Sequence, residues 1–291
     1  MGFDPNDGLN FLCYGDSGSG KTTLWSSFPK PILCIICSGG QKPGELRSIN
    51  TPEMRKVVST VTLQRPSEMD EVTKALDLGV LKHGSGHPYA TVVLDHVSGF
   101  QDLKLMAYKG LSAIPQQKSF GIATKQDWGE ITAQIKEHLV KLLSLRCNVV
   151  VIGQERVFLP GRGDDDDTKN LKLAMEEAGV LKPKVGAALT PGLVGWLNPT
   201  CDYIVQTFIR DRYIEEESVT KVGGKEVKSV MRTRVPGVEF CARTGKHEIF
   251  MTKFRVPDAK LPEVLVLGDS VNGVRKKPSG YDQIIKLING A

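Results

Sequence analysis

A glycine-rich loop at residues 15–22 is the feature that most constrains how this chain can fold. The loop reads GDSGSGKT and lies between a short apolar run, residues 9–14, and a segment with helical character that begins near Lys21. Gly15, Gly18 and Gly20 allow the backbone to turn so that its N–H groups face a phosphate. This motif requires a strand before it and a helix after it. Because both are indicated here, the sequence predicts a phosphate-binding loop.

The residues of this loop also predict its ligands. Lys21 has the position of the lysine that reaches β- and γ-phosphates, and Thr22 that of the hydroxyl that binds Mg²⁺. The start of the following helix adds a partial positive charge. We therefore expect ATP and Mg²⁺ as cofactors. The predicted nucleotide-binding residues are Gly15, Asp16, Ser17, Gly18, Ser19, Gly20, Lys21, Thr22 and Thr23.

Apolar runs alternate with amphipathic segments through the first half of the chain. Strands are predicted at 31–37, 56–63, 90–94 and 148–153, and a helix at 66–81. Asp127 and Glu130 predict a capping box that opens a second helix. Strands that are apolar throughout and alternate with helices are typical of a parallel sheet covered on both faces. The predicted fold class is therefore α/β, with a mostly parallel sheet between helices.

The last third of the chain has a different pattern. Residues 160–200 are rich in glycine, proline and charge, and two β-type runs then flank Gly223 and Gly224, which predicts an antiparallel hairpin. A last strand is predicted near 248–254 and a short helix at 281–288. We expect a core domain at 1–270, which includes a mobile loop region at 155–200 and a β extension at 202–256. A tail at 271–291 follows.

Polar residues end two of the predicted strands. Asp95 closes the run TVVLD, where P-loop proteins keep a magnesium-binding carboxylate, although it could instead cap a turn. Gln154 closes the next apolar strand and could sense a γ-phosphate or position water; the alternative is a surface amide. His96 follows Asp95, and we expect it to be structural rather than a general base.

Hydrolysis needs a group that polarises water, and no motif selects one. The acidic candidates are Glu45, Asp95 and Glu155. The predicted catalytic set is Lys21, Asp95, Gln154 and Glu45.

Composition bears on compartment and partners. The chain has six cysteines, and in a strand Cys34 and Cys37 would point to opposite faces, so reduced core thiols are expected rather than a zinc site. We see no signal peptide and no apolar run as long as a membrane span, so a cytoplasmic protein without a membrane partner is expected. A formal charge of +5 permits an anionic partner without indicating one.

Several segments together resemble one family. They are GDSGSGKTTL, PILCIICSGG, TVVLDHVSGF, QDWGEI, VVVIGQE and CARTGKHEIFMTKFRVPDAKLPEV. They are similar to phage-type AAA/RecA-like P-loop proteins, including the Sak-type single-strand annealing recombinases. The resemblance spans about residues 9–266. It implies a RecA-like core, host cytoplasm if the protein is viral, and ATP-dependent action on single-stranded DNA.

The resemblance also implies roles for particular residues. Asp95 would be the Walker B acid, and Gln154 a switch that couples the nucleotide to a loop beginning at Glu155. Subunits of this kind meet head to tail in rings or filaments, and a single-strand binding protein is a further expected partner. The residues implied near DNA are Arg156, Phe158, Arg162, Lys169 and Lys172, and those implied to act on a neighbouring subunit's ATP are Arg243 and Lys246.

Two features depart from the family's pattern. Ser38 stands where the family commonly has an acid at the end of the second strand, so Glu45 would have to substitute or hydrolysis would be slow. The acidic run 164–167 lies in the implied DNA loop and would oppose a phosphate backbone. A nucleotide-dependent switch that acts on a protein partner therefore stays open as an alternative. So does a small-molecule phosphotransferase, although no substrate-specific motif indicates one.

Overall fold

The computed structural model describes residues 8–37, 45–111, 123–158, 182–222, 225–256, 261–271, 274–275 and 280–289. Within them, ten strands form one sheet in the order β10-β9-β8-β7-β1-β5-β4-β2-β3, and β6 pairs with β5 beside this path. The strands from β3 to β7 in this order run parallel, and those beyond β7 are antiparallel. The predicted α/β class, with a mostly parallel core and an antiparallel extension, is confirmed.

The strands have the following bounds: β1 Asn10–Gly15, β2 Ile32–Ile36, β3 Val58–Thr62, β4 Thr91–Asp95, β5 Asn148–Phe158, β6 Lys184–Ala187, β7 Tyr203–Val222, β8 Lys225–Arg243, β9 Val264–Val271 and β10 Val274–Arg275. The helices are α1 Lys21–Trp25, η1 Glu45–Ile49 (3₁₀), α2 Pro52–Arg55, α3 Glu68–Asp77, α4 Val97–Lys109, α5 Lys125–Leu143, α7 Pro191–Thr200 and α8 Gly280–Ile288.

Helices cover both faces of the parallel sheet, which explains why its inner strands β2 and β4 are almost wholly apolar. Every residue of β2 and β4 is buried. One core cluster packs α3, α4, α5 and α7 against the sheet, and a second packs α1, η1 and α8 against the other face. Cys34 belongs to the second cluster and Cys37 to the first, so the two thiols point to opposite faces as predicted.

The six cysteines are unpaired thiols, as expected. Burial raises the pKa of the Cys13 thiol to about 12 and that of the Cys147 thiol to about 11. Among the described residues no group of three His, Cys, Asp or Glu side chains could hold a metal ion. No helix in the described part of the chain is both long enough and apolar enough to cross a bilayer.

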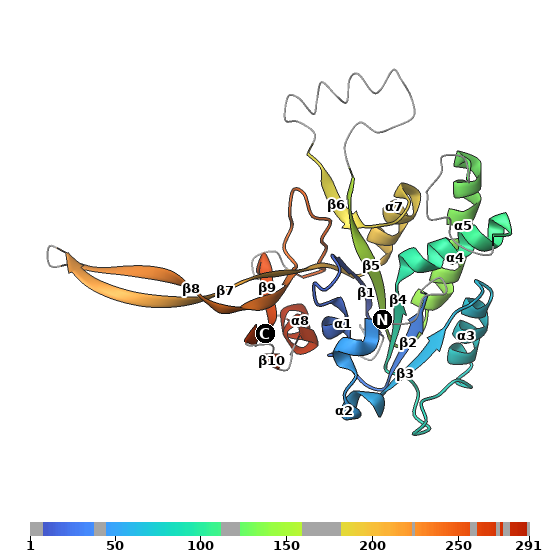
Figure 1. Cartoon of the computed structure of the whole chain (residues 1–291), viewed down its shortest axis with the longest axis horizontal. Helices are drawn as coiled ribbons and strands as arrows, with labels where there is room; N and C mark the ends of the chain where they lie inside the picture. Colours follow the sequence, from blue (N-terminus) through green and yellow to red (C-terminus); the bar gives the residue numbers. More distant parts are fainter. Residues whose placement is uncertain are drawn as a thin grey trace, which may run out of the picture.

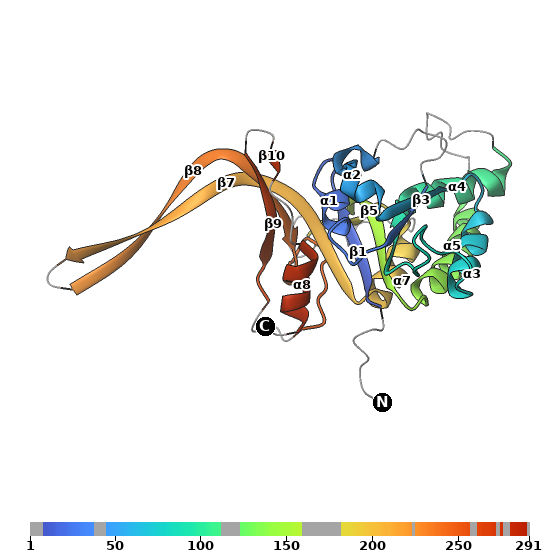
Figure 2. The same ribbon diagram turned by 90° about the horizontal axis from the view of Figure 1, so that it is seen from below.

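The hairpin β7–β8 extends far beyond the rest of the molecule (Figures 1 and 2). Its strands have 20 and 19 residues and pair from Gln206–Arg243 out to Val222–Lys225, with a register shift between Asp211 and Tyr213. On its other side β8 pairs with β9 only over Val238–Arg243. The antiparallel hairpin was predicted; the turn residues Gly223 and Gly224 lie outside the described residues.

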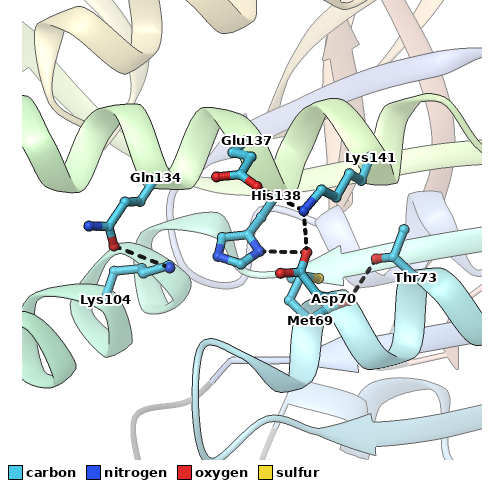
Figure 3. A network of polar contacts seen from close by, with 8 residues as sticks. All are labelled: Met69, Asp70, Thr73, Lys104, Gln134, Glu137, His138 and Lys141. Atoms are coloured by element: carbon cyan, nitrogen blue, oxygen red, sulfur yellow. Dashed lines mark hydrogen bonds and ion pairs between the residues drawn. The ribbon is translucent and has the colours of Figure 1, made fainter.

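A polar network joins α3, α4 and α5, which cover the same face of the sheet (Figure 3). His138 Nδ1 lies 3.0 Å and Lys141 Nζ 3.1 Å from the same oxygen, Asp70 Oδ1. Lys104 Nζ donates to Gln134 Oε1 at 3.4 Å. Desolvation, followed by the charge of Lys104, lowers the pKa of His138.

Three predictions about local structure were wrong. The capping box of α5 is formed by Thr124 and Asp127, not by Asp127 and Glu130, because Asp127 occupies the third helical position and bonds back to the Thr124 backbone. No continuous strand forms at 248–254: Phe250 and Lys253 make only isolated bridges, to Val185 and Ile204. The N–H groups of Ile249 and Phe250 donate instead to His247 Nδ1. The late strand is β9 instead.

The third concerns the loop expected from Glu155. Strand β5 does not end at Gln154 but continues to Phe158, because Glu155–Phe158 pair with β6. The region 155–200, expected as a loop, therefore contains the end of β5, β6 and α7, while 159–181 lie outside the described residues. The terminal helix was predicted and is α8; its Tyr281 N–H donates to Ser27 Oγ at 2.9 Å.

Candidate nucleotide-binding site

The glycine loop joins β1 to α1, as its sequence predicted. Gly18 and Gly20 have φ angles of +79° and +98°, in the region that favours glycine. Gly20 caps α1, and its carbonyl accepts the Leu24 N–H at 2.8 Å. The loop is closed by a hydrogen bond of 3.2 Å from the Ser19 N–H to the Asp16 carbonyl. The backbone therefore has the turn that a phosphate-binding loop needs.

Lys21 lies over this loop. Its Nζ donates to the Gly15 and Asp16 carbonyls, at 2.7 Å each. Desolvation lowers the pKa of Lys21 overall, and the charges of neighbouring groups that include Asp95 and Asp16 partly oppose this shift. These acids favour the cationic form of the amine, which is the form that binds a polyphosphate.

A hollow of about 280 Å³ lies between the loop, the carboxyl end of β4 and the middle of β5. From the loop and the start of α1 it is lined by Ser17, Gly18, Gly20, Lys21, Thr22 and Thr23. From the two strands and the residue after β4 it is lined by Asp95, His96, Ile152 and Gln154. The structure therefore brings the predicted phosphate, magnesium and switch residues to one place.

Asp95 fits the role of a magnesium ligand. It is the last residue of β4, only 6% exposed, and lines the same hollow as Thr22. A carboxylate and a hydroxyl oxygen are ligands that Mg²⁺ accepts, with phosphate oxygens and water completing the shell. His96 is structural, as expected, because its Nδ1 accepts the Gly99 N–H at 2.8 Å and caps α4.

Gln154 lies on the strand directly beside the loop. In the parallel pairing of β1 with β5 it is in register with Gly15, and β5 separates β1 from β4. Its side chain is exposed and lines the hollow. The amide thus faces the nucleotide site between the loop and Asp95.

The structure describes the side chains of only some of the acids proposed to activate water. Glu155 Oε2 accepts a hydrogen bond of 2.9 Å from Gln206 Nε2 of β7. Glu45 is the first residue of η1, and its side chain lies outside what the structure describes, as does Ser38. The choice between Asp95, Glu155 and Glu45 stays a prediction.

The residues implied near DNA are only partly described. Arg156 and Phe158 lie on β5 beyond Gln154, and the Arg156 guanidinium lies 5.6 Å from the Phe158 ring centroid. Arg162, Lys169 and Lys172 lie outside the described residues, as does the acidic run 164–167.

The two residues implied to act on a neighbouring subunit differ in placement. Arg243 is held within its own chain: it donates to Glu263 Oε1 at 2.7 Å, and its guanidinium lies 4.5 Å from the Phe250 ring centroid. Lys246 is exposed and lines a separate hollow of about 460 Å³ that contains no P-loop residue. Their action on another subunit stays a prediction.

Sequence reasoning missed a group of residues from the hairpin that also contact the loop. Thr207 of β7 lies with its Oγ1 2.7 Å from Ser19 Oγ, and the Phe240 ring of β8 lies against Gly20. The one available signal was the polar pair Gln206-Thr207 inside the apolar run YIVQTFI.

Comparison with known proteins identifies the family of this chain. The search of curated protein sequences found no match. Among solved structures, the flagellar accessory protein FlaH from Methanocaldococcus jannaschii is similar, with a TM-score of 0.38 and 7% identity over 92% of this chain and 91% of that one. A family profile described as an AAA domain matches residues 7–236. With the phosphate loop, Asp95 and Gln154 at one hollow, the chain belongs to the AAA domain family of P-loop proteins.

Proposed function

We propose that this chain is a magnesium-dependent ATPase that uses its nucleotide to control binding of single-stranded DNA. One observation carries the proposal. Strand β5 has Gln154 in the nucleotide hollow and, at the next alternate positions, Arg156 and Phe158. Alternate residues of a strand share a face. A change in the position of Gln154 is therefore passed along a single strand to an exposed cation and an aromatic ring.

The nucleotide half of the proposal follows from the hollow. The loop N–H groups and Lys21 would hold the β- and γ-phosphates, and Thr22 and Asp95 would hold Mg²⁺. The bound ion neutralises charge on the phosphate oxygens. The Gln154 amide, which lines the hollow, would hydrogen bond either to the γ-phosphate or to the attacking water.

The DNA half rests on the edge formed by β5 and β6. Arg156, Lys182 and Lys184 are exposed cations at this edge, and Phe158 is paired with Lys184. Glu248 neutralises part of this charge, since it accepts from Lys182. Cationic side chains beside an aromatic ring favour a single strand, because its phosphates and unstacked bases can both be contacted.

The test measures ATP hydrolysis and the shift of a labelled oligonucleotide for the wild type, Lys21→Ala and Arg156→Ala. Arg146→Ala is the matched control, because Arg146 is also exposed but precedes the opposite end of β5. We expect hydrolysis stimulated by single strands in the wild type and no hydrolysis in Lys21→Ala. Arg156→Ala should bind DNA about tenfold more weakly at low salt, and Arg146→Ala like the wild type. No DNA binding by the wild type at low salt would refute the DNA half alone.

A nucleotide-dependent switch on a protein partner is the second candidate. It is favoured by apolar side chains of the hairpin, since Ile209, Ile214 and Met231 are 43%, 42% and 61% exposed. Exposed apolar residues that gather on one element mark protein contacts. A partner captured by the wild type, retained after nuclease treatment and lost with Met231→Lys would move the function to this candidate.

A further inference from the structure

The inner end of the β7–β8 hairpin lies directly against the phosphate loop. The Ser19 and Thr207 hydroxyls are 2.7 Å apart, and Thr207 Oγ1 also donates to the Tyr14 carbonyl at 3.3 Å. Ser19 is 4% exposed and Thr207 is fully buried. With Thr207 donating to the carbonyl, the Ser19 hydroxyl is left to donate to Thr207. The two hydroxyls thus form a short hydrogen-bonded chain that ends on the carbonyl of Tyr14, the next-to-last residue of β1.

The glycines of the motif are fitted to the same hairpin. A Cβ on Gly15 would lie 2.3 Å from the Thr207 carbonyl oxygen and 2.6 Å from its Oγ1. A Cβ on Gly20 would lie 2.9 Å from Phe240 Cδ1. All three distances are below normal contact, so a side chain at either position would push the loop and the hairpin apart. The close approach therefore depends on glycine for space as well as for backbone conformation.

Gln206, the residue before Thr207, contacts β5, the strand that carries Gln154. Gln206 is 4% exposed, and its Nε2 donates to Oε2 of Glu155, the neighbour of Gln154. Its Oε1 is buried without a hydrogen-bond partner in the described part of the chain. Since successive residues of a strand point to opposite faces, Gln206 contacts β5 beside Gln154 while Thr207 contacts the phosphate loop.

We propose that Thr207 is a positioning residue for ATP binding: its hydroxyl holds Ser19, and with it the phosphate loop, in the conformation that accepts the nucleotide. This inference rests on the proposed nucleotide function. It adds the hairpin to the nucleotide-binding apparatus, because Thr207 belongs to β7 and shares that strand with the exposed outer part of the hairpin.

The experiment compares Thr207→Val, Thr207→Ser and Thr91→Val with the wild type. Thr91 is the matched control: it is also fully buried, its hydroxyl donates to the Pro29 carbonyl at 2.8 Å, and it lies at the opposite end of β4 from Asp95. Two quantities are measured for each variant. They are the dissociation constant of Mg-ATP by titration calorimetry and the midpoint of urea unfolding without nucleotide.

We expect Thr207→Val to bind Mg-ATP about tenfold more weakly, the size of one lost buried hydrogen bond. Thr207→Ser keeps the hydroxyl and should bind within about twofold of the wild type. Thr91→Val should lower the unfolding midpoint without changing the dissociation constant. Ser19→Ala removes the other half of the contact. If Thr207→Val does not fold, the test uses Ser19→Ala instead. A tenfold loss of Mg-ATP affinity in Ser19→Ala, with the affinity of Thr207→Ser unchanged, then supports the proposal.

The outcomes separate this inference from the proposed function. If the wild type does not bind Mg-ATP, or binds it no better than Lys21→Ala, both the proposed nucleotide function and the role of Thr207 are refuted. A wild type that binds while Lys21→Ala does not, together with Thr207→Val at wild-type affinity, overturns the role of Thr207 and leaves the nucleotide function standing. Equal losses in Thr207→Val and Thr91→Val also overturn it, because they would reflect general loss of stability.

Discussion

The inner and outer ends of the β7–β8 hairpin share one antiparallel ladder and differ in what lies beside it. At the inner end β7 also pairs with β1, β8 pairs with β9, and Thr207 and Phe240 are buried against the phosphate loop. Beyond the register shift at Asp211, the described strands pair only with each other, and Ile214 and Met231 are exposed. The same backbone pattern therefore supports a binding site at one end and an open surface at the other. The side chains that lie beside the ladder, not the strand pairing, therefore decide whether an end contributes to a site or forms an open surface.

The largest expected effect comes from the contact of Gly20 with the inner end of the hairpin. Gly20→Ala adds a Cβ at a φ of +98° that would also lie 2.9 Å from the Phe240 ring. Backbone strain and overlap together should lower the free energy of unfolding by about 3 kcal/mol. Gly18→Ala is the matched variant: its φ is +79°, and no atom lies within 4 Å of the added Cβ. It should cost only about 1 kcal/mol. Equal losses in urea titrations would mean that the hairpin contact contributes nothing.

Asp95→Asn tests the part of the site that does not depend on the hairpin. The carboxylate at the end of β4 is expected to bind Mg²⁺. The asparagine amide is a weaker ligand, so the variant should lose most of the increase in ATP affinity that Mg²⁺ provides, a loss of about tenfold. Titration with ATP in Mg²⁺ and in EDTA measures this gain. An unchanged magnesium dependence would assign the ion to other ligands. The loss should be the same in a chain whose outer hairpin has been shortened.

Shortening the outer hairpin tests the other side of the comparison. Residues 215–232 would be replaced by an Asn-Gly turn that joins Ile214 to Thr233, which are cross-strand partners. An isolated two-stranded ribbon is marginally stable, so we expect the free energy of unfolding to change by less than about 1 kcal/mol. Mg-ATP affinity should stay within about twofold of the wild type. A tenfold loss of affinity would show that the outer part takes part in nucleotide binding and would remove the distinction between the two ends.

The smallest effect is expected in a region that contacts neither end, the polar network of α3, α4 and α5. Burial holds the pKa of His138 below 6.5, so below that pH the unfolded chain takes up a proton that the folded chain resists. Stability should therefore fall as the pH drops below about 6.5, the ordinary pKa of histidine.

Asp70 changes stability in the same direction, but only below its ordinary pKa of 3.8 and therefore outside the range from pH 7.5 to 5.5. Although desolvation raises the pKa of Asp70, hydrogen bonds from Lys141 and His138 lower it overall. His138→Gln cannot titrate, and it should reduce the difference in unfolding free energy between pH 7.5 and 5.5 by about 0.5 kcal/mol. Denaturant titrations at both pH values measure this difference. A steeper pH dependence in the variant would contradict the assignment, whereas Mg-ATP affinity at pH 7.5 provides the control that the site is intact.

What the sequence predicted correctly depends on local patterns. Gly18, Gly20 and Lys21 belong to a motif whose spacing fixes its geometry, and Asp95 and Gln154 follow apolar runs that could only be buried parallel strands. Because carboxyl ends of parallel strands meet at one edge of a sheet, these residues converge whatever the detailed packing.

What the sequence did not predict depends on contacts between distant segments. Ser19 and Thr207 are 188 positions apart, and no local pattern reports their pairing. The continuation of β5 past Gln154 depends on β6, which lies beyond a stretch with no apolar strand signal. Arg243 reads as a free cation in sequence, yet in the fold it contacts Glu263 and Phe250.

The unbroken length of β7 has a mechanical consequence. From Thr207, beside the phosphate loop, the strand continues to Val222 at the far end of the hairpin. At a rise of about 3.3 Å per residue this distance is roughly 50 Å. A rotation of about 5° at the inner end, no larger than a side-chain adjustment around the loop, would displace the tip by about 4 Å at that rise. A sub-ångström change beside the phosphate loop would thus become a movement of several ångströms at the tip of the hairpin.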